Sequence, residues 1–388
     1  MTTTAAPVLP APALDRLPEL TAALAGCAAA HDRDAELPLA DFELLHGAGL
    51  LTATVAARHG GPEAGLGDTV RILRALGAGD PAVALITAMT LFTHAAEARA
   101  PHWPAGPLAD LLAASARRPV LVNSLRVEPE LGSPVRGGLP ATTARRRGDG
   151  WELTGRKTYS TGAYVLDWLL VWAATDEPRP RVGSFLVRAG SPGVTVEPVW
   201  DHLGLRASRS DDVRLAAVPV PGDHVAGLAP AGPDGGRDHT AGAWNGLGLG
   251  ALYLGVADAA RDWLLGFLHE RTPTALGAPL ASLPRFQSAV GEIEVALTGA
   301  HRLVAALAAA VDAGEPGAAE QAGGAKLLAT RAAIDAVQQA VALVGNHGLT
   351  RRHPLERHLR DVLCARVHTP QDDAVLLAAG RTALDRRR

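Results

Sequence analysis

The chain has 388 residues, of which 47% are hydrophobic and 20% charged, and it carries a formal net charge of −3 at pH 7. This length and composition are typical of a soluble globular protein with two or three domains, and they exclude an intrinsically disordered chain. The positive charges are dispersed along the chain, which leaves no continuous basic surface for a nucleic-acid backbone.

Cysteine usage and the distribution of apolar segments bear on the cellular compartment. Cys27 and Cys364 lie near opposite ends of the chain and have neither metal-ligand spacing nor the pattern of a disulfide framework. Residues 1–14 are rich in Pro and Ala but lack the basic and apolar regions of a signal peptide. Charges and glycines interrupt the later apolar segments well short of a membrane span. We therefore expect a cytoplasmic protein without a metal site or a membrane segment.

The first part of the chain has a helical pattern. Apolar residues recur at spacings of three and four within residues 17–30, 41–51, 69–76 and 82–98, and glycines and prolines separate these segments. The pattern predicts an all-helical domain over residues 1–117.

The pattern changes after Arg118-Pro119. Short runs rich in β-branched and aromatic residues, separated by Gly, Pro and Asp turns, occupy residues 120–122, 151–154, 168–172, 184–187, 194–199 and 212–218. These runs predict a central β domain over residues 118–225.

A Gly/Pro-rich connection leads into a second helical region. Long segments with a helical apolar period cover residues 241–270, 283–313, 315–344 and 370–384, and an antiparallel bundle buries such faces well. We therefore expect a helical bundle over residues 226–388. The whole chain is expected to be an α+β multidomain protein with the order helices, β domain, helices.

Several signals follow one another near the end of the chain. The helix ends in Gly345-Asn346-His347-Gly348, and His353-Pro354-Leu355-Glu356-Arg357 and Arg360-Asp361 come next. Together with the domain order, this run resembles the acyl-CoA dehydrogenase superfamily. The resemblance implies an N-terminal helical domain, a central β-barrel or sandwich and a C-terminal four-helix bundle. It also implies FAD, with FMN as the alternative, and a homodimer or homotetramer. We interpret Glu356, Arg357, Arg360 and Asp361 as structural ion pairs without a catalytic role.

The residues that would remove a proton from carbon are missing. Members of this superfamily place a catalytic glutamate nine residues after the position of Arg360, which here is Thr369, and some place it instead at the position of Asn245. Neither side chain can take a proton from a carbon acid near neutral pH. Asp372 or Asp373 could act as the base only if the chain were locally shifted by three or four residues relative to the family.

Another set of residues is similar to the flavin monooxygenases of this superfamily, of the dibenzothiophene-oxidising type. In the run 155–162, Tyr159 and Thr161 match residues that face the flavin, and Ser160 adds a second donor. Asn123, in Asn123-Ser124-Leu125, and His94 match residues near the flavin ring and the substrate. Each match has a plainer alternative. The run 155–162 can be the edge of a β-hairpin, Asn123 can satisfy a strand end, and His94 can be a hydrogen-bonded core histidine.

The resemblance carries over to individual positions. It implies catalytic roles for His94, Asn123, Ser160 and His368. It implies cofactor contacts from Leu125, Val127, Ser133, Tyr159, Ser160, Thr161, Arg271, Gln287, Gly345, Asn346, Gly348, Gln371 and Asp373. The match is incomplete, because Leu276 stands where the family usually has Phe and Ala342 where it has Gln. A helix-end glycine turn without a cofactor is the alternative for residues 345–348.

These residues favour a two-component flavin monooxygenase that acts on an aromatic, indole-like or amine-bearing small molecule. No Gly-x-Gly-x-x-Gly turn of a nicotinamide-binding site is found, so a separate flavin reductase would supply the reduced flavin. Two alternatives stay open: an acyl-CoA or acyl-carrier dehydrogenase with a displaced base, and a non-catalytic flavin- or acyl-binding protein.

Overall fold

The computed structural model describes residues 11–131, 138–231 and 238–385. Helices precede the strands as α1 (Ala11–Asp15), α2 (Leu17–Asp34), α3 (Leu39–Gly47), α4 (Leu66–Gly79), α5 (Pro81–Arg99) and α6 (Ala105–Ser115). Asp80 starts α5, because its Oδ1 accepts the backbone N–H of Ala82 at 2.8 Å while Pro81 occupies the first helical turn.

The central part of the chain forms one mixed sheet. Its strands are β1 (Val122–Leu125), β2 (Thr143–Arg147), β3 (Gly150–Lys157), β4 (Trp168–Thr175), β5 (Arg181–Arg188), β6 (Val194–Glu197), β7 (Asp212–Val220) and β8 (Val225–Pro230). The strand order is β6-β7-β3-β2-β4-β5-β8, and β1 pairs in parallel with β4. Strand β4 is buried on both faces, with Leu169 and Val171 in the main core and Trp168 and Leu170 against α6.

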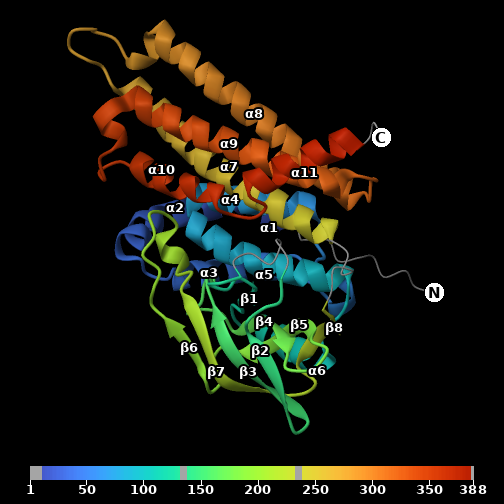
Figure 1. Cartoon of the computed structure of the whole chain (residues 1–388). Helices are drawn as coiled ribbons and strands as arrows, with labels where there is room; N and C mark the ends of the chain where they lie inside the picture. Colours follow the sequence, from blue (N-terminus) through green and yellow to red (C-terminus); the bar gives the residue numbers. More distant parts are fainter. Residues whose placement is uncertain (1–10, 132–137, 232–237, 386–388) are drawn as a thin grey trace.

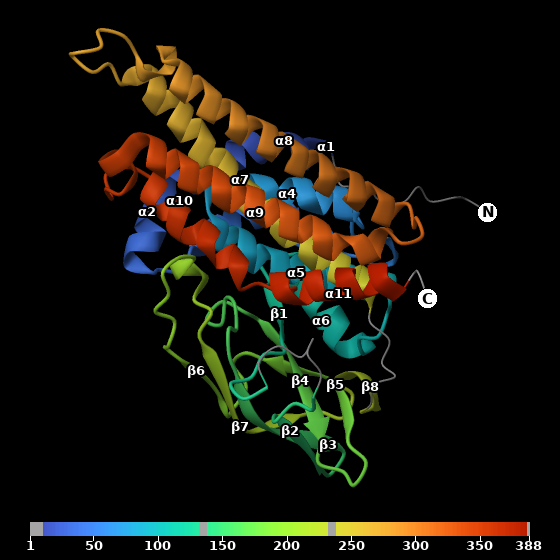
Figure 2. The same cartoon turned by 45° about the horizontal axis from the view of Figure 1, so that its top comes forward.

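The chain then returns to helices. They are α7 (His239–Glu270), α8 (Pro284–Asp312), α9 (Ala318–Val344), α10 (Leu355–Leu363) and α11 (Asp372–Asp385). Figure 1 shows the sheet at one end of the molecule, the bundle at the other, and α4 and α5 between them. The turned view in Figure 2 shows α11 lying along α9. Helix α5 packs on β1 on one side and on α7 on the other, so the three predicted domains meet around it.

Helices α4 and α7 approach each other closely at glycines. A Cβ on Gly77 would lie 2.2 Å from the backbone oxygen of Leu252, and one on Gly255 would lie 2.1 Å from that of Arg74. Any larger side chain at either position would separate the two helices. Asp312 at the end of α8 also accepts the first backbone N–H groups of α4. The N-terminal helices and the bundle therefore form one packed unit.

The expected fold is confirmed: a helical N-terminal part, a central sheet and a C-terminal helical bundle. Strands β2 and β8 were not expected from the sequence, and the predicted domain boundary at 225/226 falls at the start of β8.

One statement about the apolar segments was wrong. Within the described ranges, the segments Pro284–Asp312 and Ala318–Gly348 are long and apolar enough to pass for membrane spans by length and composition. Half of the apolar window in the second segment is buried inside the molecule, and a core helix of a soluble protein passes the same test.

Candidate functional site

The site predicted from the sequence starts where α5 packs on β1. Thr90 on α5 donates through Oγ1 to the backbone oxygen of Val122 at 3.3 Å and accepts the backbone N–H of Val122 at 3.0 Å. His94 lies one helical turn beyond Thr90, and Asn123 follows Val122 in β1. These contacts bring His94 and Asn123 to the same junction.

The two segments predicted to face the flavin are joined by hydrogen bonds. The backbone N–H of Thr158 donates to the oxygen of Val127 at 3.0 Å, and Asn123 Nδ2 donates to the oxygen of Thr161 at 3.1 Å. Leu125, whose side chain is buried in the main core, lies between these two contacts. The structure therefore brings Asn123, Leu125, Val127 and Thr161 together at one junction, and their contacts with a flavin stay a prediction.

Buried polar atoms without a partner mark this junction. Ser160 is 1% exposed and His94 is 6% exposed, and neither Ser160 Oγ nor His94 Nε2 has a hydrogen-bond partner among the described residues. A buried polar group without a partner costs free energy, so such groups are rare unless a ligand or water completes them. Thr87 Oγ1, two helical turns before His94, is also buried without a hydrogen-bond partner among the described residues. Thr87 was not predicted as a site residue from the sequence. These donors and acceptors fit a polar ring system such as a flavin with its substrate.

Burial also sets the charge of His94. Removal from water lowers the pKa of its imidazole to about 4, because the charged form loses its hydration. The imidazole is therefore neutral near pH 7, and it can exchange a hydrogen bond with a ligand without adding a positive charge to the site.

A third segment, residues 206–211, completes the junction and was missed by the sequence analysis. Ser210 Oγ donates to Thr161 Oγ1 at 3.1 Å and lies 2.9 Å from Ser208 Oγ. The backbone N–H of Gly162 donates to the oxygen of Ser208 at 2.8 Å, and that of Ser160 donates to Asp211 at 3.2 Å. The polar cluster just before β7 was the available signal for this segment.

Tyr159 lies at the open side of the same segment. Its side chain is 60% exposed, its φ is +54°, and its ring makes edge contacts with Trp200 and His202, whose rings stack at 3.6 Å. A positive φ is unusual for a bulky residue and turns the side chain out of the strand direction. The ring is exposed enough to contact a ligand, and its predicted stacking on a flavin stays a prediction.

A buried ion pair supports the strand that leads into this segment. Lys157 Nζ lies 2.6 Å from Glu128 Oε1, and the two side chains are almost completely buried. Burial lowers the pKa of Lys157 to about 8, although Glu128 opposes the shift. Glu128 also accepts the N–H and hydroxyl of Thr142, and these bonds together with Lys157 outweigh its own burial and lower its pKa. Loss of either partner would leave a buried charge.

The two positions where the family carries its base touch each other. Asn245 Nδ2, on α7, donates to the backbone oxygen of Thr369 at 2.7 Å. At the two positions where the resemblance places the family's carboxylate base, the chain carries an amide and a hydroxyl side chain. Asp372, a candidate for a displaced base, instead pairs with Arg331 at 3.0 Å on an exposed surface.

Lys326 holds the turn that contains Thr369. Its side chain is fully buried, and Nζ donates to the backbone oxygens of Ala365, His368 and Pro370 at 3.2, 2.9 and 3.1 Å. The ammonium group thus satisfies carbonyl groups that the chain leaves unpaired where the helix ends.

His368 points back to the bundle. Its Nδ1 lies 2.7 Å from the hydroxyl of Tyr253, and burial together with the charge of Lys326 lowers the pKa of His368 to about 4. Burial raises the pKa of Tyr253, so the phenol keeps its proton. The neutral phenol of Tyr253 and the neutral imidazole of His368 thus share one hydrogen bond, whose direction depends on the tautomer of the imidazole.

Arg271, Gln287 and the glycine turn 345–348 form a separate group at one end of the bundle, whereas Gln371 and Asp373 follow the Thr369 turn near the start of α9. Arg271 ends α7 and accepts the N–H of Leu280, while Gln287 donates to Ala281 in the same connection. This connection, golden in Figure 1, projects from the bundle away from the sheet.

The glycine turn lies beside the same end of α7. It contains Gly345, Asn346 and Gly348, and its His347 ring packs 5.0 Å from Phe267. Gln371 and Asp373 lie at the start of α11, and Ser133 lies outside the described residues. Direct flavin contacts of this group stay a prediction.

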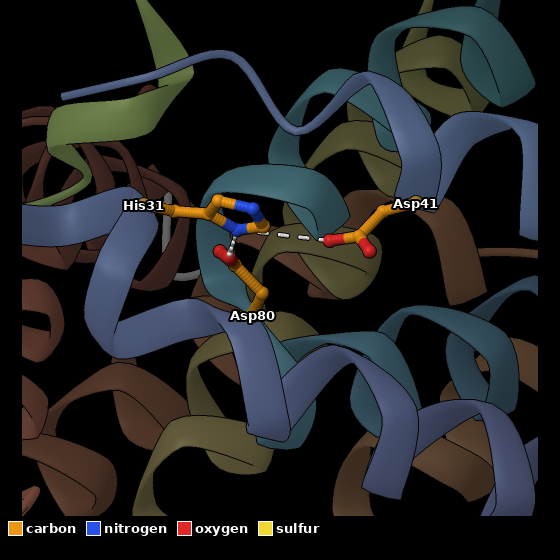
Figure 3. Close-up of side chains that lie close together, drawn as sticks. All are labelled: His31, Asp41 and Asp80. Atoms are coloured by element: carbon orange, nitrogen blue, oxygen red, sulfur yellow. Dashed lines mark hydrogen bonds and ion pairs between the residues drawn. The ribbon is translucent and has the colours of Figure 1, made fainter. Parts of the chain in front are cut away.

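One further cluster has metal-like proximity. Ligand atoms of His31, Asp41 and Asp80 lie within 4.8 Å of one another (Figure 3). His31 Nδ1 is 2.9 Å from Asp80 and 3.7 Å from Asp41, and the hydrogen bond to Asp80 raises the pKa of the imidazole despite its burial. Burial raises the pKa of Asp41 to about 6. Because Asp80 also caps α5, an ion pair between α2, α3 and α5 accounts for the cluster.

Comparison with known proteins identifies the family. Residues 127–218 match the acyl-CoA dehydrogenase middle domain, and residues 247–372 match the acyl-CoA dehydrogenase C-terminal domain. The putative acyl-CoA dehydrogenase YdbM of Bacillus subtilis (strain 168) is 32% identical over 351 residues, which cover 90% of each chain.

Solved structures with the same fold include KijD3, a nitrososynthase and a dibenzothiophene monooxygenase. KijD3 in complex with FMN and dTDP-3-amino-2,3,6-trideoxy-4-keto-3-methyl-D-glucose is 30% identical, with a TM-score of 0.82 and coverage of 98% and 95% of the two chains. The nitrososynthase of Micromonospora carbonacea var. africana is 26% identical, with a TM-score of 0.81 and 98% of each chain covered. The dibenzothiophene monooxygenase TdsC of Paenibacillus sp. A11-2 shares the fold at 21% identity, a TM-score of 0.81 and coverage of 94% and 95%. The chain belongs to the acyl-CoA dehydrogenase family of flavin-dependent oxidoreductases.

Proposed function

We propose that this protein is a flavin-dependent monooxygenase that oxygenates an amine-bearing small molecule. The observation that carries the proposal is the pair Asn245 and Thr369, because the two positions that hold the family's base are bonded to each other and neither is a carboxylate. Removal of a proton from the carbon next to an acyl thioester requires such a base. Oxygenation of a nitrogen lone pair does not.

The reaction draws on reduced flavin and O2. The reduced flavin supplies two electrons, one oxygen atom goes to the substrate nitrogen, and the other leaves as water. A separate reductase would supply the reduced flavin, and FAD and FMN both remain candidates.

The residues at the junction would place the ring and the substrate. Ser160 and Asn123 offer polar groups beside the flavin, and buried His94 would receive the amine. A neutral His94 can accept a hydrogen bond from an amine N–H through Nε2 when that nitrogen is unprotonated. The same burial excludes water, which strengthens each of these hydrogen bonds.

The choice of an amine among the expected substrates rests on the relatives above 25% identity. KijD3, by its description, binds FMN and an amino-keto sugar nucleotide, and the nitrososynthase is named for a product in which a nitrogen is oxidised. Their coverage of nearly the whole chain supports a related substrate class here.

Two further parts of the proposal concern assembly and compartment. The connection 271–283 projects from the bundle away from the sheet (Figure 1), which supports a homo-oligomer in which this bundle end of one subunit reaches the flavin of a neighbour. A cytoplasmic location agrees with both cysteines being free.

A second candidate is an acyl-CoA dehydrogenase, favoured by the 32% identity to YdbM over 90% of the chain. It would need a base other than residues 245 and 369, and Asp372 is already paired with Arg331. A non-catalytic flavin- or acyl-binding protein is the third candidate.

Anaerobic mixing separates these candidates. Protein loaded with oxidised flavin is mixed with a panel of acyl-CoA thioesters, and the flavin absorbance is followed. We expect no bleaching, whereas the same protein given reduced flavin, O2 and an amine panel should consume O2 and form an oxygenated amine. Bleaching by an acyl-CoA without added reductant would contradict the proposal, and flavin binding without either reaction would favour the non-catalytic reading.

A further inference from the structure

Helix α10 contacts the loop from residue 203 to residue 211 through its backbone. A Cβ on Gly204 would lie 2.3 Å from the backbone oxygen of Arg360 and 2.8 Å from the backbone nitrogen of Asp361. Only glycine allows this approach, so the loop lies directly on the helix.

Two charged side chains of α10 hold the same part of the loop. Asp361 Oδ1 accepts the backbone N–H of Leu205 at 2.7 Å, and Arg360 Nη1 donates to the oxygen of Leu203 at 3.0 Å. Asp361 is 3% exposed, and hydrogen bonds to buried charged groups are among the stronger ones in proteins. Arg360 is fixed in turn by a bidentate pair with Asp32 of α2, at 2.7 and 2.6 Å.

The other end of the loop holds the segment predicted to face the flavin. Backbone N–H groups of Ser160, Gly162 and Ala163 donate to loop oxygens at 3.2, 2.8 and 3.3 Å. The loop's Ser210 hydroxyl also donates to Thr161 Oγ1. An unbroken series of hydrogen bonds thus runs from α10 to residues 160–163.

We infer that Asp361 and Arg360 are positioning residues for the flavin site, acting through the loop 203–211 on Ser160 and Thr161. The link between α10 and residues 160–163 stands on the contacts alone, and its effect on the flavin rests on the proposed function. The sequence analysis gave these two residues only a structural ion-pair role. Their partners show that they act on a loop of another domain.

The surroundings of Asp361 explain why a hydrogen-bond acceptor is needed there. A small cavity of about 10 Å³ separates it from Asp32, Asp80, Arg206 and Arg357. Burial raises the pKa of Asp361 to about 7, and the charge of Arg357 and the N–H of Leu205 oppose this shift. A neutral apolar side chain would leave the Leu205 N–H without an acceptor and would remove the negative charge that faces the Arg357 guanidinium across the cavity.

The test compares variants at the two ends of the contact with a matched control. Asp361→Ala removes the acceptor, Gly204→Ala forces the loop away from α10, and Asp361→Asn keeps an acceptor as a conservative rescue. Asp258→Ala is the control, because Asp258 is an equally buried carboxylate that pairs with Arg74 and His301 and does not touch the loop. The measurements are hydrogen exchange of the amides of Ser160, Gly162 and Ala163, and the Kd of the purified protein for FMN and FAD.

We expect exchange at these amides and the flavin Kd to rise roughly tenfold in Asp361→Ala and Gly204→Ala, with most of the effect restored in Asp361→Asn. Asp258→Ala should keep the wild-type values at a temperature where it is folded. The inference would be overturned if hydrogen exchange at these amides were unchanged in both Asp361→Ala and Gly204→Ala. It would also be overturned if exchange at these amides rose equally in Asp258→Ala. Faster exchange with an unchanged flavin Kd would overturn the positioning role. A wild-type protein that binds no flavin would instead contradict the proposed function, and the exchange result would still decide the link.

Discussion

At the scale of single residues, the candidate site contains buried polar atoms that have no hydrogen-bond partner among the described residues. Ser160 Oγ and His94 Nε2 are enclosed at the junction of α5 and β1, while Asn123 and Thr161 already bond each other. Burial of a polar group without a hydrogen-bond partner costs free energy, unless a ligand supplies the partner. We therefore expect Asn123 and Thr161 to hold the site together, and Ser160 and His94 to bind the ligand.

Replacement of His94 by Gln is the residue-scale prediction. Product formation should fall roughly a hundredfold, the order of magnitude for loss of a positioned catalytic side chain. Consumption of O2 by reduced flavin should continue, so the ratio of product to O2 consumed should fall as well. His301→Asn serves as control, because His301 lies on α8 and pairs with Asp258, away from the junction of α5 and β1. An unchanged ratio in His94→Gln would remove His94 from the site.

At the scale of elements, the turn after α10 is held by one buried cation. Lys326 on α9 bonds the backbone oxygens of Ala365, His368 and Pro370, and Tyr253 on α7 bonds His368 from the other side. The position that holds the base in the family is therefore rigidly placed although the base is missing.

Replacement of Lys326 by Met tests this role. It leaves buried carbonyl groups without a donor, and we expect the free energy of unfolding to fall by about 2 kcal/mol. The change should also loosen the turn around His368, so the KM for substrate should rise more than kcat falls. Thermal unfolding and steady-state kinetics measure the two effects. Wild-type stability in Lys326→Met would contradict the role assigned to the ammonium group.

The sequence predicted whole elements better than contacts between them. Helices α2, α5, α7, α8 and α9 have clear apolar periods and were expected within a few residues of their ends. Strand β2 was missed because its sequence Thr-Ala-Arg-Arg-Arg exposes all but Ala144, which resembles a polar loop. The loop 203–211 was missed because its role depends on Asp361, more than 150 residues away. Long-range contacts of this kind leave no local period in the sequence.

At the scale of the whole molecule, buried titratable groups make stability depend on pH in opposing directions. Burial lowers the pKa of His94 and His368 to about 4 and that of His358 to about 3, from 6.5. The unfolded chain therefore binds more protons between about pH 6.5 and pH 4, and acidification destabilises the fold. Asp361 and Asp41, whose pKa values burial raises to about 7 and about 6, bind protons in the folded state first and oppose this loss.

The contribution of one histidine can be isolated with His358→Asn. Because the folded pKa of His358 is depressed, its stabilising contribution is present above pH 6.5 and is lost as the pH falls. The wild type should lose about 2 kcal/mol more stability than the variant between pH 7 and pH 5. Chemical denaturation at a series of pH values measures the difference. Parallel stability profiles would contradict the assignment of His358 as a neutral buried imidazole.

The central claim is that this fold has lost the dehydrogenase base and transfers oxygen to a substrate nitrogen. The most direct measurement supplies reduced flavin and isotope-labelled O2 to the purified protein with an amine substrate, and follows the label by mass spectrometry. The account predicts one labelled oxygen atom on the nitrogen of the product. An unlabelled product with a new carbon–carbon double bond would contradict it.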